Sequence, residues 1–259
     1  MWQSELDAFV QYLHAAGRAP TTIRLRRMHL ERAFTWLDTP PFDVEEDRLT
    51  AYLAANDWKP ESRKSVRASL RGFYTWAAKT GRVTKDPSLN LPQVAVPQAI
   101  PHPTPTEVVD SALATASRDQ VLMLMLAAYA GLRRAEIAGL HSRNVEGDTL
   151  RVTGKGGKTR EVPLHPRLVE GLRGREGFIF PGKDHGHLSP DWVGKQMKAV
   201  LGGGWTAHSL RHRFATRAYA GERDLLTVQQ LLGHSSVATT QRYTQVPDDA
   251  RRRAVLNVA

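Results

Sequence analysis

The stretch of sequence that decides the fold reads His208-Ser-Leu-Arg211-His212, then Leu232-Gly233-His234, then Thr239-Thr240-Gln-Arg-Tyr243. It places a tyrosine hydroxyl downstream of imidazoles and a guanidinium, in a chain whose formal net charge is +10. A phenol that attacks a phosphodiester must lose its proton, and cations must stabilise the negative charge that develops around phosphorus. The stretch contains a candidate residue for each of these tasks.

Two earlier segments complete the pattern. Residues 130–137 read Ala-Gly131-Leu-Arg133-Arg-Ala-Glu136-Ile, and residues 154–163 read Gly-Lys155-Gly-Gly-Lys158-Thr-Arg160-Glu-Val-Pro. Together with the C-terminal stretch they resemble, in order and over more than half of the chain, the motifs of the tyrosine recombinase (phage integrase) family. These motifs are G-L-R-x-x-E, the G-K-G-x-K hairpin, H-x-L-R-H, and L-G-H before the tyrosine. The resemblance implies a mainly α fold with a small antiparallel β-sheet (α+β), in which an N-terminal helical core-binding bundle precedes a catalytic domain.

The resemblance also implies a set of catalytic residues: Arg133, Lys155, His208, Arg211, His234 and Tyr243. Tyr243 would attack the phosphodiester and form a 3′-phosphotyrosyl bond. The two arginines would hold the nonbridging oxygens, a task that suits a planar and permanently charged guanidinium. Lys155 would protonate the leaving 5′-oxygen, His208 would assist proton transfer around the tyrosine, and His234 would donate a hydrogen bond to the phosphate. Because this transfer conserves the bond energy, no ATP, metal or other cofactor is expected.

The glycine-rich turn contains two lysines with different expected roles. Lys155 occupies the family position, the first lysine of G-K-G-x-K, whereas Lys158 is expected to contact a phosphate. The run Gly157-Lys158-Thr159 also suggests a nucleotide-binding P-loop. That motif requires a glycine at position 152, which is Val152 here, and the expected context is strand–turn–strand rather than strand–loop–helix.

The two histidines of H-x-L-R-H lie one helical turn apart, a spacing that also occurs in zinc sites. The zinc-protease signature requires a glutamate after the first histidine, and this position is Ser209. No third ligand is evident and the chain has no cysteine, so neither a metal site nor a disulfide is expected. His212 and Glu136 are expected to brace the site rather than to react.

Charge and hydropathy limit the classes of partner. The chain has 259 residues, with 36 Lys+Arg against 26 Asp+Glu and a pI of about 10.1, which favours a polyanionic partner. A net positive charge by itself does not identify a nucleic-acid-binding protein, because many small basic proteins bind no specific partner. The N-terminus lacks the basic-then-apolar plan of a signal peptide. The most apolar run, residues 121–130, is too short to span a bilayer and is expected as a buried helix. A cytoplasmic protein, associated with the nucleoid when bound to DNA and independent of membranes, is expected.

Three regions are expected: a core-binding helical domain over 1–90, a proline-rich linker over 91–104, and a catalytic domain over 105–259 that ends in an exchange tail. Apolar residues within 4–80 recur at helical spacing in four stripes: Leu6, Phe9, Val10 and Leu13; Leu30, Ala33, Phe34 and Leu37; Leu49, Tyr52 and Leu53; and Val66, Leu70, Phe73 and Ala77.

The second and fourth helices also carry basic residues on other faces: Arg24, Arg26, Arg27, Arg63, Lys64, Arg67 and Arg71. The resemblance implies that these helices lie on DNA and neutralise phosphates, although a charge run is usually a solvated face.

The second half of the chain mixes helical and strand patterns. Helices are expected from Thr104-Pro-Thr-Glu107 onward and at about 118–131, 134–140, 189–201, 208–220, 224–232 and 237–244. Residues 150–153 and 159–164 alternate like two strands around the glycine-rich turn, which predicts a β-hairpin. A third strand is expected at 178–180.

The resemblance implies a site-specific DNA recombinase whose partners are double-stranded DNA attachment sites. It implies a monomer in free solution that assembles as a homotetramer on two duplexes, exchanges strands through a Holliday junction and responds to an accessory directionality factor. An integrase of a phage or mobile element is the leading interpretation. A Xer-like enzyme that resolves chromosome dimers, a type IB topoisomerase and a non-catalytic DNA-binding regulator are the alternatives. The short interval from L-G-H to the tyrosine disfavours the topoisomerase, and the complete set of six residues disfavours the regulator.

Both ends of the chain carry expectations. The core-binding helices begin within a few residues of the first methionine, which leaves no room for an arm-binding domain and predicts a short attachment site. After Tyr243, a small apolar patch of Ala254, Val255, Leu256 and Val258 is expected to dock reversibly on a neighbouring protomer. The small apolar residues at the end of the chain are also typical of a degradation signal, which is the alternative.

Overall fold

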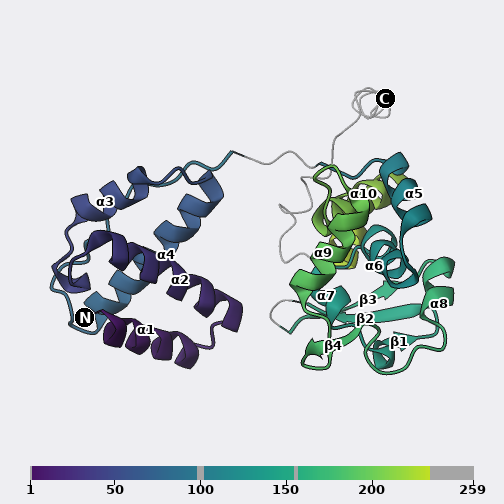
Figure 1. Ribbon diagram of the computed structural model, residues 1–259, viewed down its shortest axis with the longest axis horizontal. Coiled ribbons are helices and arrows are strands. Elements are labelled where there is room, and N and C mark those ends of the chain that lie inside the picture. Colours follow the sequence, from purple (N-terminus) through teal and green to yellow (C-terminus); the bar gives the residue numbers. More distant parts are fainter. Residues whose placement is uncertain (1, 98–101, 155–156, 234–259) are drawn as a thin grey trace, which may run out of the picture. The chain divides into compact units, whose positions relative to one another are not determined.

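The computed structural model describes residues 2–97, 102–154 and 157–233 of the chain (Figure 1). The chain divides into two compact units, Met1–Ala99 and Ile100–Ala259, each with its own hydrophobic core. Helices predominate in the described residues of both units, and the described strands all belong to the second unit. The expected mainly α fold with a small antiparallel sheet is therefore confirmed. The helix expected at 237–244 and the C-terminal tail lie outside the described residues.

Four α-helices and one short 3-10 turn make up the described part of the first unit. They are α1 (Gln3–Ala15), α2 (Pro20–Leu37), the turn η1 (Pro41–Asp43), α3 (Glu46–Ala55) and α4 (Pro60–Lys79). Both α2 and α4 begin with a proline, because its fixed φ suits the first helical turn and its missing N–H has no helical partner there. α2 contacts α1, α3 and α4 (Figure 1). The four expected helices thus form a bundle.

The apolar stripes expected from the sequence form the core of this bundle. The ring of Phe73 lies 5.4 Å from that of Phe9 and 5.0 Å from that of Phe34, in edge-to-face arrangements that stabilise aromatic cores. Val10, expected in the first stripe, is only half-buried. Leu91, which the sequence placed at the start of the linker, is 2% exposed and belongs to this core.

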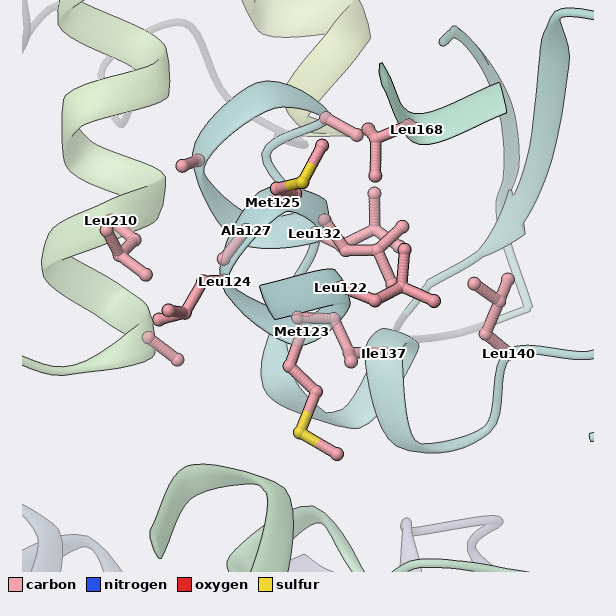
Figure 2. Close-up of a cluster of buried hydrophobic side chains, with 14 of the residues drawn as sticks. Leu122, Met123, Leu124, Met125, Ala127, Leu132, Ile137, Leu140, Leu168 and Leu210 are labelled. Carbon is pink, nitrogen blue, oxygen red and sulfur yellow. The ribbon is translucent and has the colours of Figure 1, made fainter. Parts of the chain in front are cut away.

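The described part of the second unit consists of helices around a small sheet. The helices are α5 (Thr106–Thr115), α6 (Arg118–Tyr129), α7 (Arg134–Ala138), α8 (Pro166–Leu172), α9 (Pro190–Leu201), α10 (Ala207–Glu222) and α11 (Leu225–Leu232), with one 3-10 turn, η2 (Ser142–Asn144). α6 contacts five of these helices, α5, α7, α8, α9 and α10. Residues 122–128 are consequently all buried, as the apolar run predicted (Figure 2).

Three short strands form an antiparallel sheet in the order β1 (Val145–Glu146), β2 (Thr149–Thr153) and β3 (Thr159–Pro163). Leu150 pairs with Val162 and Val152 pairs with Arg160, which confirms the expected hairpin. Because side chains alternate along a strand, Arg160 shares the face of the buried Val162. This register turns a charged residue toward the interior.

The prediction of a strand at 178–180 is wrong, because the third strand of the sheet is β1. Residues 178–180 make one isolated bridge, between Phe178 and His141. Ile179 and Phe180 are both buried, so this segment runs through the core without the alternation of a half-buried strand. The strand β4 (Pro181–Asp184) begins only after it. Helix α8 was also missed, because two buried leucines in a helix of 7 residues are too few to reveal a helical period.

Gly131 makes the turn between α6 and α7, and its replacement tests that turn. Its φ is +63°, and an added Cβ would lie 2.4 Å from Cδ1 of Phe214. We expect Gly131→Ala to lower the free energy of unfolding by about 2–4 kcal/mol, from backbone strain and overlap together. Urea unfolding followed by circular dichroism measures this change.

Gly221 is the matched control for Gly131. It lies in α10, and an added Cβ there would have no atom within 4 Å. Gly221→Ala should leave stability unchanged or raise it by up to about 1 kcal/mol, because alanine favours helix. Equal stability of the two variants would contradict the role assigned to the turn.

Candidate active site

Arg133 immediately precedes α7, and Glu136 lies in the first turn of that helix. Oε2 of Glu136 accepts a hydrogen bond from the backbone N–H of Arg133 at 2.9 Å, and Oε1 accepts one from Nη1 of Arg133 at 2.8 Å. The carboxylate thus satisfies an N–H that has no partner within the helix, and its charge suits the positive end of the helix. The spacing of G-L-R-x-x-E therefore pairs this guanidinium with its own carboxylate.

Arg160, on β3, binds the same carboxylate. Its Nη1 and Nη2 donate to Oε1 and Oε2 of Glu136 at 3.0 and 2.8 Å, and the two side chains are 9% and 4% exposed. Burial by itself would raise the pKa of Glu136, but hydrogen bonds from Arg160 and Arg133 bring that pKa below its ordinary value. The carboxylate is therefore ionised at neutral pH and holds both guanidiniums.

Arg211 reaches the same place from α10. Its Nη1 donates to the carbonyl oxygen of Gly131, and its Nη2 donates to that of Leu232 at 2.5 Å. The same Nη1 lies 3.9 Å from Oε2 of Glu136. Arg211 is 3% exposed, so these groups fix a guanidinium that is nearly out of contact with water.

The three guanidiniums converge on the carboxyl end of α11. Nε of Arg160 donates to Leu231 O at 2.7 Å, Nη2 of Arg211 to Leu232 O, and Nη2 of Arg133 to Gly233 O at a longer 3.5 Å. The last carbonyls of a helix have no helical partner and carry partial negative charge, so cations are stabilised there. Gly233 has a φ of +60°, and an added Cβ would lie 3.0 Å from Cδ of Arg160. The glycine of L-G-H therefore permits this close approach.

Arg133 is more exposed to solvent than Arg160 and Arg211. Arg133 keeps 36% of its side chain exposed, against 9% for Arg160 and 4% for Arg211. One carboxylate balances three guanidiniums, so the cluster has an excess of positive charge. Such a cluster suits an anion, with Arg133 presented to it and the other two beneath.

His208 lies on α10, one turn before His212, and the two ring centroids are 4.2 Å apart. Partial desolvation of its ring, followed by the positive charges of Arg211 and Arg133, holds the pKa of His208 below its ordinary value, although the residue as a whole is exposed. An imidazole accepts a proton only in its neutral form. Desolvation, together with the nearby arginines, therefore favours the neutral form of His208, which can accept a proton.

If His208 accepts a proton during DNA cleavage, as the resemblance to the tyrosine recombinases implies, this shift predicts the pH dependence of the reaction. Because protonation removes the acceptor and the pKa is lowered from 6.5, the rate should fall on acidification with a midpoint below pH 6.5. The measurement is the single-turnover rate of covalent complex formation between about pH 5 and 8. His208→Asn should lower the rate and remove this acid limb. A midpoint above 6.5, or an acid limb unchanged in the variant, would contradict the role of His208.

The structure describes half of the six residues expected to be catalytic. It brings together Arg133, His208 and Arg211, whereas Lys155, His234 and Tyr243 lie outside the described residues. Gly154, the residue before Lys155, lies close to the arginine cluster, because a Cβ added at this glycine would lie 3.4 Å from Oε1 of Glu136. Within the described residues, no group of three His, Cys, Asp or Glu side chains is placed to hold a metal ion.

Several residues expected to contact DNA are engaged within the protein. Arg27 pairs with Asp7 and Glu31 at 2.9 Å each. Nη2 of Arg63 donates to Asn56 O at 3.1 Å. Nε and Nη2 of Arg67 donate to Leu91 O at 3.2 and 2.6 Å, which ties down the segment that follows the bundle. The exposed residues of the expected set are Arg24, Lys64 and Lys158.

The remaining two, Arg26 and Arg71, line a hollow of about 270 Å³ between α1, α2 and α4, together with Arg18 and Lys79. Aromatic residues form part of its wall, and the described lining contains no carboxylate. Desolvation, and then the charge of the neighbouring Arg18, lower the pKa of Arg26 from its ordinary value. Such a hollow suits an anion such as a phosphate.

Sequence reasoning missed Arg160 as a member of the site. Its motif was recognised, but no role was given to the residue. The signal was present in the alternation of the strand, because Arg160 lies two positions before the apolar Val162 and so shares its face. An arginine on the buried face of a strand requires a buried acceptor.

The site and the sequence identify the class of protein. The sequence profile of the phage integrase family matches residues 105–249. The chain is 32% identical over 276 residues to tyrosine recombinase XerC of Rhodospirillum centenum, and this alignment covers 95% of this chain and 76% of that protein. It is 31% identical over 276 residues to tyrosine recombinase XerD of Pseudomonas aeruginosa, and this alignment covers 93% of this chain and 92% of that protein. The chain belongs to the phage integrase family. It is an enzyme of the tyrosine recombinase type.

Solved structures share the fold. The integrase from mycobacterium phage Brujita is 29% identical, with a TM-score of 0.52 and coverage of 96% of this chain and 90% of that one. A lambda integrase dimer bound to a core site has a TM-score of 0.74 at 21% identity, and the match covers 97% of this chain and 78% of the lambda integrase chain. At that identity the likeness concerns the fold alone. Among the residues that the structure describes, no helix is long and apolar enough to cross a membrane.

Proposed function

We propose that this chain cleaves and rejoins double-stranded DNA at a specific site through a 3′-phosphotyrosyl intermediate. The observation that carries the proposal is the convergence of three guanidiniums on the end of α11, with one of them exposed. Gly233, whose carbonyl oxygen Arg133 contacts, is followed in the sequence by His234 and then, nine residues later, by Tyr243. The positive charge of the site thus lies at the segment of chain that leads, in sequence, to the expected nucleophile.

The proposed reaction begins at the phenol of Tyr243. Its oxygen attacks the scissile phosphorus while His208 takes up its proton, and the bond between phosphorus and the 5′-oxygen breaks. Lys155 supplies a proton to the leaving oxygen, which departs as a 5′-hydroxyl. Arg133 and Arg211 stabilise the charge on the nonbridging oxygens, the largest contribution that a protein makes to phosphoryl transfer. A 5′-hydroxyl from a second strand then reverses these steps and releases the tyrosine.

The proposed assembly is a homotetramer on two duplexes, joined in a Holliday junction. The related lambda integrase was solved as a dimer bound to a core site, which supports duplex DNA as the partner of this chain. The hollow lined by Arg26 and Arg71 supports the proposal that the first unit binds a DNA phosphate. A directionality factor and docking of the C-terminal tail on a neighbouring protomer belong to the same proposal.

Two biological roles fit this chemistry. Similarity to a mycobacteriophage integrase favours integration or excision of a mobile element, and similarity to XerC and XerD proteins favours resolution of chromosome dimers. Deleting the gene from its host separates them. Loss of an integrase stops excision of the element, whereas loss of a dimer-resolving enzyme leaves sister chromosomes joined at division.

A suicide substrate tests the enzymatic proposal. The duplex carries the core site, obtained from the DNA that flanks the gene, with a nick beside the scissile phosphate so that the cleaved fragment diffuses away. The wild-type chain should accumulate a protein–DNA adduct that resists denaturant. Strand exchange between two intact duplexes then separates a recombinase from a topoisomerase. Binding without any adduct would support a non-catalytic regulator instead.

Arg71 and Arg67 form a matched pair for testing DNA contact. Arg71 lines the basic hollow, whereas the guanidinium of Arg67 is bound to Leu91 O. Arg71→Ala should weaken binding to a duplex and reduce the slope of log K against log salt by about 1, because one fewer counterion is released. Arg67→Ala should leave the slope unchanged and lower stability. Fluorescence anisotropy across a salt series measures both slopes, and the reverse result would contradict this assignment.

A further inference from the structure

The buried pair of Arg160 and Glu136 joins the strand β3 to α7 and α11. Arg160 lies on β3, Glu136 on α7, and the carbonyl that Nε of Arg160 contacts belongs to Leu231 on α11. All three nitrogens of this guanidinium are therefore engaged by the protein, at 2.7–3.0 Å. Because every nitrogen of this guanidinium already has an acceptor within the protein, Arg160 is suited to holding its neighbours in place rather than to binding DNA itself.

Removing this guanidinium would affect the groups around it. Glu136 would keep its bonds to Arg133 but lose two of its hydrogen bonds, and Arg211 is too distant, at 3.9 Å, to replace them. Leu231 O, near the end of α11, would also lose its donor. A buried carboxylate with too few partners moves toward another cation or toward water. Either shift would move the guanidinium of Arg133, which the same carboxylate holds.

We infer that Arg160 is a positioning residue for DNA cleavage, which acts through Glu136 on Arg133 and through Leu231 on the end of α11. This inference rests on the proposed function. The fork geometry of the guanidinium is essential to it, because two parallel hydrogen bonds fix the plane of the carboxylate and one ammonium contact does not. Displacing a reacting group by about 1 Å can reduce a rate by about 10²-fold. Arg160 should therefore matter for the chemical step far more than for DNA affinity.

The test compares Arg160→Lys and Arg160→Gln with the matched control Arg151→Lys. Arg151 lies on the neighbouring strand β2, where its guanidinium makes exposed pairs with Glu146 and Glu161 at 3.5 and 3.9 Å. For each variant, duplex affinity is measured by anisotropy. The first-order rate of adduct formation is measured on the nicked substrate at saturating protein. Thermal unfolding reports whether each variant is folded.

We expect both Arg160 variants to bind DNA within about twofold of wild type and to form adduct about 10²-fold more slowly. Lysine should not rescue the rate, and Arg151→Lys should leave it unchanged. In a cycle with Glu136→Gln, the double variant should be no slower than the slower single variant, because both changes break one interaction. This coupling is read from the rate rather than from stability.

Several results would overturn the inference. One is a near-normal rate in Arg160→Lys, which would mean that only the charge matters. Equal losses of affinity and rate would assign Arg160 to DNA binding, and additive effects with Glu136→Gln would mean that it acts without Glu136. Failure of both Arg160 variants to fold would assign the residue to stability alone. The proposed function fails separately: in that case the wild-type chain itself forms no adduct, or Tyr243→Phe still forms one.

Discussion

Tyr243→Phe should bind its DNA site with unchanged affinity and form no covalent adduct. The substitution removes one oxygen, the atom proposed to attack phosphorus, and leaves every cation of the site in place. Because no other group can replace a missing nucleophile, the loss should be complete, beyond the about 10³-fold that removal of one stabilising group typically causes. The measurement is adduct formation on the nicked duplex under denaturing electrophoresis, with wild type beside it. A denaturant-resistant band from the variant would show that another residue attacks.

Arg211→Lys should reduce the rate of adduct formation by about 10²–10³-fold with little change in duplex affinity. Two carbonyl groups fix the fork of this buried guanidinium, and a lysine ammonium cannot reproduce both contacts while also facing a phosphate. The retained charge makes this a test of geometry rather than of net charge. Single-turnover kinetics on the nicked duplex provides the rate.

Arg213 is the matched control on the same helix. It is 6% exposed, like Arg211 nearly buried, but its guanidinium binds Thr104 O at 3.0 Å and Oγ1 of Thr106 at 3.2 Å, away from the cluster. Arg213→Lys should lower stability and leave the rate of cleavage within a few-fold of wild type. Similar losses of rate in the two variants would mean that α10 requires buried arginines for its packing and not for catalysis.

Local spacing in the sequence predicted most of the helices and the hairpin. The four apolar stripes of the first unit each lie within one helix, where a period of 3.6 residues determines which side chains face the core. The run at 121–130 was instead recognised by its length and apolar character, and residues 122–128 are buried on every side of α6. The failures were elements without such a period. The helix α8 has 7 residues, β1 has 2, and residues 178–180 are buried in succession.

The sequence by itself determined the class of enzyme and the candidate residues, because G-L-R-x-x-E, H-x-L-R-H and L-G-H place chemically distinct groups at short fixed spacings. Only the tertiary structure decided which charges act together. Arg160 meets Glu136 across 24 residues and Leu231 across 71, and Arg67 meets Leu91 across 24. Such pairings depend on how separate elements pack, and no local period encodes that packing. The same residue type thus holds other groups in place at Arg160 and Arg67 and is a partly exposed cation at Arg133, according to which carbonyl or carboxylate the fold brings to it.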